Sequence, residues 1–196
     1  EHWIPSLDGI KAKMESGAVV ADIGCGLGSS TILMAKTFPN SKIYGFDFHE
    51  PSILEARKKA RDDGLTNIEF DVREARDLPN NNFDFACIFD ALHDMGDPVG
   101  VSKAILNTLN KDGTFMLVEP YAQDELKDNL NIASGLFYTF STLICVPTSR
   151  SQDVGLQLGA QAGEKRLRSV LNEAGFSDIQ RRCIDIETNI VLEAKA

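Results

Sequence analysis

The sequence contains few of several residue types and lacks several kinds of segment. Its 196 residues include one tryptophan, three tyrosines and four cysteines. No internal repeat, low-complexity tract or Gly/Ser/Pro-rich linker divides the chain. With 43% hydrophobic and 25% charged residues, the composition is close to the globular average, which excludes disordered, collagen-like and coiled-coil proteins. A chain of this length predicts one domain with a sizeable buried core.

Basic residues are outnumbered by acidic ones, 20 against 29, which gives a formal net charge of −9. Broad contact with phosphate backbones or anionic membranes needs clustered cations, so this balance disfavours nucleic acid as a partner. The longest apolar stretch, residues 136–146, contains Ser and Thr and falls short of the ~20 residues that a membrane span needs. No signal peptide begins the chain. We therefore expect no membrane association.

The four cysteines, Cys25, Cys87, Cys145 and Cys183, are far apart in the sequence and form no Cys-x-x-Cys pair. No histidine accompanies them at metal-ligand spacing, so the pattern favours reduced thiols in a cytoplasmic protein over a disulfide scaffold or a metal site. Residue 1 is Glu and not Met. We expect from this that the chain is processed or cut, with a part missing upstream.

Strand-like and helix-like segments alternate along the chain. Strands are expected at residues 18–23, 42–47, 67–71, 83–89, 114–118, 179–184 and 188–194. Helices are expected at residues 31–38, from 51 to about 63, 97–109 and 166–173, after a helical lead-in at 1–16. This alternation predicts an α/β protein with a doubly wound, mostly parallel sheet covered on both faces, and ligands bind such sheets at the carboxyl ends of the central strands.

The strongest motif is a glycine loop, residues 22–30 (DIGCGLGSS), between the first strand and the first long helix. Glycines there allow close backbone approach to a ligand, and the helix start offers unpaired N–H groups. A dinucleotide loop, G-x-G-x-x-G, would have its third glycine at position 29, where this chain has Ser29; the third glycine is Gly28. No Gly-Lys-Ser/Thr follows, so the P-loop pattern also fails.

This loop resembles the first motif of the Rossmann-like (class I) S-adenosylmethionine-dependent methyltransferases, and the likeness extends from about residue 17 to the C-terminus. The resemblance implies a seven-stranded sheet in the order 3-2-1-4-5-7-6, with the last strand antiparallel. It also implies that the loop binds S-adenosyl-L-methionine and releases S-adenosyl-L-homocysteine. The loop residues assigned to the cofactor are Asp22, Gly24, Cys25, Gly26 and Gly28.

The resemblance assigns further cofactor contacts after the second and third strands. Asp47 would accept hydrogen bonds from the ribose hydroxyls, because a carboxylate is a two-acceptor fork suited to a vicinal diol. Phe48 would pack on the adenine. Aligning on Leu-Pro places Glu74 at the adenine amino group, with the Ala75 N–H beside the ring; Asp71 is the competing candidate.

Strand four ends at residues 89–95 (FDALHDM), which would pass beneath the methionine end of the cofactor at Phe89 and open onto the methyl acceptor. The Asp-Ala-Leu-His-Asp motif resembles a narrower subfamily that carries a winged-helix-like domain upstream, as do residues 119–121 (EPY) and 134–138 (SGLFY). His93 is the candidate general base, because its intrinsic pKa is near neutral, and Asp90 is the second candidate catalytic residue. A purely structural His93 is the alternative.

Residues 121–163 interrupt the alternation, and family members place a substrate cover there. Apolar side chains between Leu136 and Ile144 predict an aromatic-lined lid over a small hydrophobic acceptor, in a methyltransferase domain at 17–196. The alternative is an interface with a second copy or with the upstream domain.

Two functions remain open. The first is a methyltransferase acting on a small, apolar or aromatic O- or N-nucleophile. The second is a cofactor-binding regulatory or oligomerisation module without transfer activity.

Overall fold

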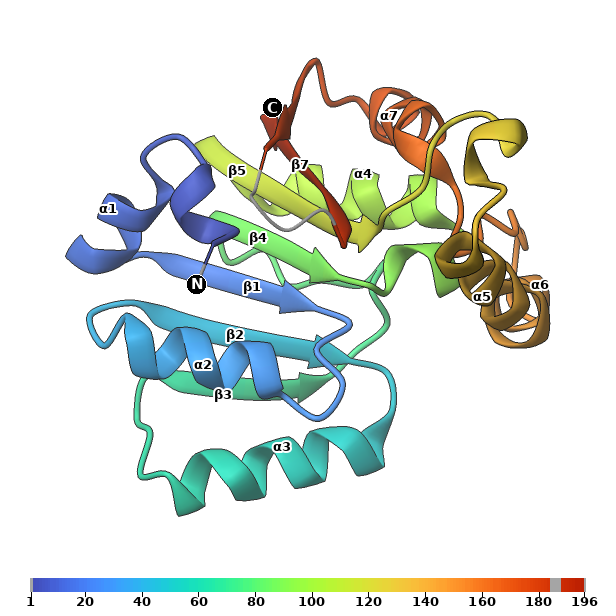
Figure 1. Cartoon of the computed structure of the whole chain (residues 1–196). Coiled ribbons are helices and arrows are strands. Elements are labelled where there is room, and N and C mark those ends of the chain that lie inside the picture. Colours follow the sequence, from blue (N-terminus) through green and yellow to red (C-terminus); the bar gives the residue numbers. More distant parts are fainter. Residues whose placement is uncertain (1, 184–187, 196) are drawn as a thin grey trace.

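The computed structural model describes residues 2–183 and 188–195, and these form a seven-stranded sheet with helices on both faces (Figure 1). The strands are β1 (Val19–Ile23), β2 (Lys42–Asp47), β3 (Ile68–Val72), β4 (Phe83–Phe89), β5 (Leu109–Pro120), β6 (Asp178–Arg182) and β7 (Asn189–Lys195). The helices are α1 (Ile10–Ser16), α2 (Ser29–Thr37), α3 (Glu50–Asp62), α4 (Pro98–Thr108), α5 (Ile132–Phe140), α6 (Val146–Arg150) and α7 (Gly163–Ala174). Shorter 3₁₀ turns lie at Ile4–Ser6, Leu92–Asp94 and Leu126–Asn129, and a π-helical turn, Ser141–Cys145, joins α5 to α6.

The strand order is β3-β2-β1-β4-β5-β7-β6, as expected. Neighbours from β3 to β5 are parallel, and β7 runs antiparallel to both β5 and β6. The order reverses beside β1, so the carboxyl ends of β1 and β4 diverge there and leave room for a ligand. The expected closing strand at 179–184 corresponds to β6; position 184 lies outside the described residues.

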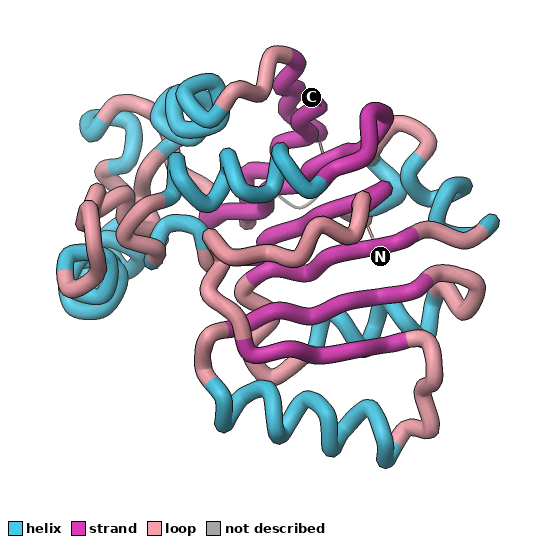
Figure 2. The backbone as a smooth tube through the Cα atoms, turned by 180° about the vertical axis from the view of Figure 1, so that it is seen from behind, coloured by secondary structure: helices cyan, strands magenta, loops and turns pink. Residues whose placement is uncertain are grey.

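Two hydrophobic layers follow from the period-two alternation of the central strands. On one face, Ala86 and Ile88 of β4 pack with the apolar faces of α4 and α7. On the other face, Phe85 and Cys87 pack with α1 and α2. Figure 1 shows α2 in front of the sheet, and α4 comes to the front in Figure 2, which views the molecule from behind.

Strand β5 is longer than expected. The sequence predicts a turn at 112–113 followed by a strand at 114–118, whereas the structure continues one strand from Leu109 to Pro120. The pairing with β4 shifts register between Phe83 and Phe85, so the extra residues are accommodated as a bulge instead of a separate turn.

Candidate functional site

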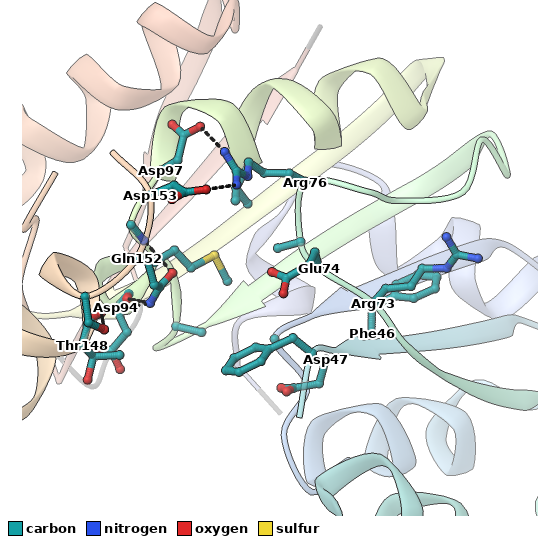
Figure 3. A pocket seen from close by; sticks show the side chains of 18 residues that line it. Phe46, Asp47, Arg73, Glu74, Arg76, Asp94, Asp97, Thr148, Gln152 and Asp153 are labelled. Atoms are coloured by element: carbon teal, nitrogen blue, oxygen red, sulfur yellow. Dashed lines mark hydrogen bonds and ion pairs between the residues drawn. The ribbon is translucent and has the colours of Figure 1, made fainter. Parts of the chain in front are cut away.

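A cavity of about 690 Å³ opens at the carboxyl ends of β1, β2 and β4. Asp47 and Glu74 lie on one side of this cavity, and Asp94, Thr148 and Gln152 lie on the opposite side (Figure 3). The first group comes from the ends of β2 and β3, and the second comes from the turn after β4 and from the segment around α6. The site therefore lies at the switch point that the topology creates.

The three glycines of the loop have positive φ angles but different surroundings. Gly26 (φ 53°) has no heavy atom within 4 Å of the place where a Cβ would stand. Gly28 (φ 74°) is crowded, since a Cβ there would stand 2.7 Å from Phe70 and 2.8 Å from Ala56. Gly24 lines the cavity. Gly26 therefore leaves space for a ligand, whereas Gly28 lets the loop pack against β3 and α3.

Asp22 is buried beneath the loop and does not line the cavity. Its Oδ2 accepts hydrogen bonds from Ser30 Oγ at 2.6 Å and Thr31 Oγ1 at 2.7 Å, which join the end of β1 to the start of α2. Burial raises the pKa of Asp22 to about 6, although the two hydroxyls oppose this shift. Asp22 therefore acts on any ligand through the loop that it holds.

Asp47 lines the cavity and also holds the loop. Its Oδ2 accepts from the Gly26 N–H at 2.8 Å, and its Oδ1 accepts from the His49 N–H at 2.9 Å. Phe48 lines the cavity with 67% of its surface exposed. Cys25 is different, because its side chain is buried between α2 and α3, so only its backbone can face a ligand.

Glu74 and Ala75 both line the cavity, whereas Asp71 does not. Asp71 instead pairs with Arg73, with Oδ2 at 2.7 Å from Nε. The pairing leaves Glu74 as the exposed carboxylate on this wall. The structure thus places the preferred candidate, and not its competitor, at the cavity.

Phe89 lies outside the cavity, so its expected role beneath the cofactor needs correction. It shares the face of β4 with Phe85 and Cys87, and its ring stacks on Trp3 with centroids 5.5 Å apart. Asp90 also lies outside the cavity wall, and its Oδ1 accepts from Asn189 Nδ2 at 2.8 Å. Partial burial and the Glu119 carboxylate raise the pKa of Asp90 to about 6.

His93 has a buried partner that the sequence did not reveal. Its Nδ1 lies 2.5 Å from Glu119 Oε2 at the end of β5, and its Nε2 lies 3.4 Å from Asp94 Oδ1. Burial lowers the pKa of His93, but the hydrogen bond and charge of Glu119 outweigh that effect, and the net shift is upward. His93 is 5% exposed and is not part of the cavity wall, whereas Asp94 is.

A cysteine thiol, that of Cys145, lies beside His93 and Asp94. Ligand atoms of His93, Asp94 and Cys145 all lie within 4.8 Å of one another, an arrangement that could hold a metal ion. Burial and the neighbouring Asp94 carboxylate raise the pKa of the Cys145 thiol to about 12. Sequence spacing missed this group because Cys145 arrives from the π-helical turn, far along the chain.

The segment at 121–163 contributes polar residues to the cavity and not the expected aromatic lining. Thr148, Ser151, Gln152 and Asp153 line the cavity. The aromatic and aliphatic side chains between Leu136 and Ile144 are absent from its described wall. The expected apolar lid is therefore wrong in its chemistry, although the segment does border the cavity.

Two of the side chains that join this segment to the rest of the site are Gln152 and Arg76. Gln152 accepts at Oε1 from the Gly96 N–H (2.9 Å) and donates from Nε2 to the Asp94 carbonyl (2.9 Å). Arg76, which lines the cavity, pairs with Asp97 at 3.4 Å and with Asp153 at 3.8 Å (Figure 3). Sequence reasoning missed Gln152 and Arg76, because no motif distinguishes them from surface polar residues.

The donor set fits S-adenosylmethionine. The carboxylates of Asp47 and Glu74 border one cavity, as a ligand with hydroxyl and amino donors requires, and Gly26, which is not part of the cavity wall, has open space beside it. Asp94 Oδ1 is buried without a hydrogen-bond partner among the described residues. Of the expected cofactor residues, Gly24, Asp47, Phe48, Glu74 and Ala75 line the cavity.

Comparison with known proteins gives a consistent family. A family described as a methyltransferase domain matches residues 14–175. A tRNA U34 carboxymethyltransferase of Campylobacter lari is 34% identical over 116 residues, covering 56% of this chain and 38% of that protein. A demethylmenaquinone methyltransferase of Lactobacillus johnsonii is 27% identical over 175 residues, covering 86% of this chain and 72% of that protein.

Solved structures share the fold. PigF with SAH superposes with a TM-score of 0.74 at 16% identity, covering all of this chain and 54% of that one. The mitomycin 7-O-methyltransferase MmcR gives a TM-score of 0.73 at 21% identity, covering 98% of this chain and 52% of that one. The chain thus spans about half the length of these structural relatives.

Proposed function

Because the chain belongs to the methyltransferase domain family, a class of S-adenosylmethionine-dependent enzymes, we propose that it methylates a small O- or N-nucleophile by direct in-line transfer. The observation that carries this proposal is one cavity with carboxylates on two facing walls. Asp47 and Glu74 form the wall suited to the cofactor, and Asp94 faces them with the His93–Glu119 pair behind it.

When bound, S-adenosylmethionine supplies an electrophilic methyl group on a sulfonium, so the chain needs mainly to bind, orient and exclude water. Asp47 would hold the ribose hydroxyls and Glu74 the adenine amino group. Phe48, exposed at the cavity, offers an apolar face to the base. These three residues form the binding side of the site.

The opposite wall supplies a group that can take a proton from the acceptor. Asp94 reaches the cavity, and its Oδ1 lies 3.4 Å from His93 Nε2. Glu119 holds Nδ1 of the same ring, which fixes the orientation of the imidazole. We therefore assign proton removal to Asp94 and a positioning role to His93 and Glu119. This revises the expectation that His93 meets the acceptor directly.

The cavity wall favours a small acceptor over a nucleic acid. It contains five carboxylates and two guanidinium groups. Arg76, one of the two, is already paired with Asp97 and Asp153. A polyphosphate backbone would meet mainly like charge here, which weakens such binding. Among the relatives, the Lactobacillus protein is a demethylmenaquinone methyltransferase and the Campylobacter protein is a tRNA U34 carboxymethyltransferase.

The test has a binding arm and a transfer arm. Titration calorimetry should show S-adenosylmethionine and S-adenosylhomocysteine binding, with no comparable binding of NAD. Labelled methyl transfer should then be measured on a panel of phenols, quinols and aromatic amines, with tRNA as a separate substrate. Failure to bind either adenosyl compound would refute the proposal, and methylation of tRNA alone would refute the small-acceptor assignment.

Two matched variants test the proton-removing group. Asp94→Asn should reduce turnover at least tenfold while leaving cofactor affinity within about twofold. Asp153→Asn removes another carboxylate from the same cavity wall and should have little effect on turnover. Equal turnover in the two variants would remove Asp94 from the mechanism.

The alternative function is a binding module without transfer activity. The burial of His93 favours it, because a buried imidazole cannot contact a methyl acceptor directly. It predicts cofactor binding with no labelled product from any acceptor class. A cytoplasmic location remains a prediction for either function.

A further inference from the structure

The helical segment from Ile132 to Arg150 turns its polar face toward the domain and its apolar face toward solvent, the reverse of an ordinary surface helix. It forms one run of helix through α5, the π-helical turn and α6, and is long and apolar enough to pass the length and composition criteria for a membrane span. Only 17% of its most apolar window is buried in the described structure. None of residues 132–149 is charged. In Figures 1 and 2 the segment projects from the side of the domain.

The face turned toward the domain consists of small polar residues. Ser134, Ser141, Cys145 and Ser149 are buried at helical spacing. Ser141 Oγ accepts from the Ala160 N–H at 3.1 Å, and Ser149 Oγ donates to the Met95 carbonyl at 3.0 Å. The helix is therefore attached to the domain through hydrogen bonds of its serine side chains. The apolar side chains on its outer side take no part in this attachment.

The outer side chains form an apolar face, which we call the 132–144 face. Its members are Ile132, Leu136, Phe137, Phe140, Leu143 and Ile144, with exposed fractions from 37% to 95%. With the exposed fractions above and about 200 Å² for a fully exposed large apolar residue, these six residues together expose on the order of 700 Å². That area is close to the ~800 Å² that each partner contributes to a standard protein interface. An exposed patch of this size on one element marks an interaction site.

We propose that the 132–144 face is the contact between two copies of this chain, packed as an antiparallel helix pair about a two-fold axis. An isologous contact needs a self-complementary surface, and an uncharged apolar face satisfies that condition. Arg150 is exposed at the C-terminal end, with the exposed Asp153 three residues beyond it, and Glu125, Lys127 and Asp128 are exposed just before the N-terminal end. Antiparallel pairing brings Arg150 of one copy toward Glu125 and Asp128 of the other.

A bilayer and a part of the protein outside residues 1–196 are the competing occupants, and the charge pattern disfavours the bilayer. Helices that lie on membranes carry Lys and Arg along their polar face, which binds anionic headgroups. This helix carries Arg150 alone, and the chain has a net charge of −9. Its inner polar face is also occupied by hydrogen bonds to the domain.

The experiment measures the sedimentation coefficient and molar mass of the full chain by analytical ultracentrifugation at micromolar concentrations. The wild type should be a dimer. Leu136→Glu should raise the dimer dissociation constant at least tenfold. Leu54→Glu on α3 is the matched control, because Leu54 is 54% exposed and Leu136 is 55% exposed. Circular dichroism of both variants establishes that each is folded.

Two further measurements distinguish a second copy of the chain from a membrane as the partner of the 132–144 face. Arg150→Glu should weaken the dimer severalfold if the ends pair as described. A wild-type monomer that cosediments with phosphatidylcholine vesicles, through a contact that Leu136→Glu abolishes, would overturn the proposal in favour of a membrane surface. A monomer that binds no vesicles would overturn it as well, as would equal dissociation constants for the Leu136 and Leu54 variants. None of these readouts depends on methyl transfer.

Discussion

The buried carboxylate of Asp22 should make the stability of this protein depend on pH in a definite direction. Its pKa is about 6 in the folded protein, against 3.8 as the ordinary value. Between these values the folded state keeps a proton that the unfolded state has released, so the free energy of unfolding falls as pH rises from about 4 through 6. The shift corresponds to a loss of about 3 kcal/mol, which is complete above the folded pKa.

Asp22→Asn tests this prediction, because asparagine keeps an oxygen for the Ser30 and Thr31 hydroxyls and carries no charge. Near pH 4 the two proteins should have similar stability. Above pH 7 the variant should be more stable than the wild type by about 3 kcal/mol relative to its low-pH difference. Asp90 also has a raised pKa, but both proteins contain it, so their difference isolates Asp22.

The assay is urea unfolding at several pH values, followed by the fluorescence of Trp3, the single tryptophan, which stacks on Phe89. A stability difference that stays constant between pH 4 and 8 would refute the argument, because it would mean that Asp22 titrates at the same pH in both states.

Other predictions concern the loop, the cofactor and the buried histidine. Gly28→Ala should lower the free energy of unfolding by about 2–4 kcal/mol, because the residue has a positive φ and its new Cβ would overlap Phe70 and Ala56. Gly26→Ala should lower it by only about 1 kcal/mol and mainly weaken cofactor binding. Urea unfolding measures the first effect and calorimetry the second. Asp47→Ala should weaken S-adenosylmethionine binding by about 1–3 kcal/mol, with Asp71→Ala as a near-neutral control, and equal losses would move the ribose contact elsewhere. The Glu119–His93 pair stabilises the fold at low pH and loses this effect as pH rises through the raised pKa of His93. Glu119→Gln should therefore lower that pKa, and NMR titration of the ring that showed no downward shift would contradict the coupling.

Much of the fold follows from local sequence patterns. Strand β2 and strand β4 have the expected bounds, because apolar β-branched and aromatic runs between turn residues specify buried strands without reference to the rest of the chain. Gly24 of the glycine loop and Asp47 line the cavity for the same reason: each lies at the end of a strand, and parallel strands end at one edge of the sheet.

Other features depended on which distant segments meet. The sequence indicated His93, but its partner Glu119 comes from the end of a different strand, and only strand pairing brings the two together. The position of Phe89 was decided by alternation along β4, which turns its ring toward Trp3.

The sequence by itself determined the order of elements and the backbone shape of the loop, because these follow from periodicity and glycine content over a few residues. Only the tertiary structure decided which side chains reach the cavity. The helical segment at 132–150 illustrates the reason. Its composition indicates an apolar element, but Ser141 Oγ accepts from the Ala160 N–H and Ser149 Oγ donates to the Met95 carbonyl, which turns the polar face inward. The apolar face is therefore exposed on the opposite side of the helix.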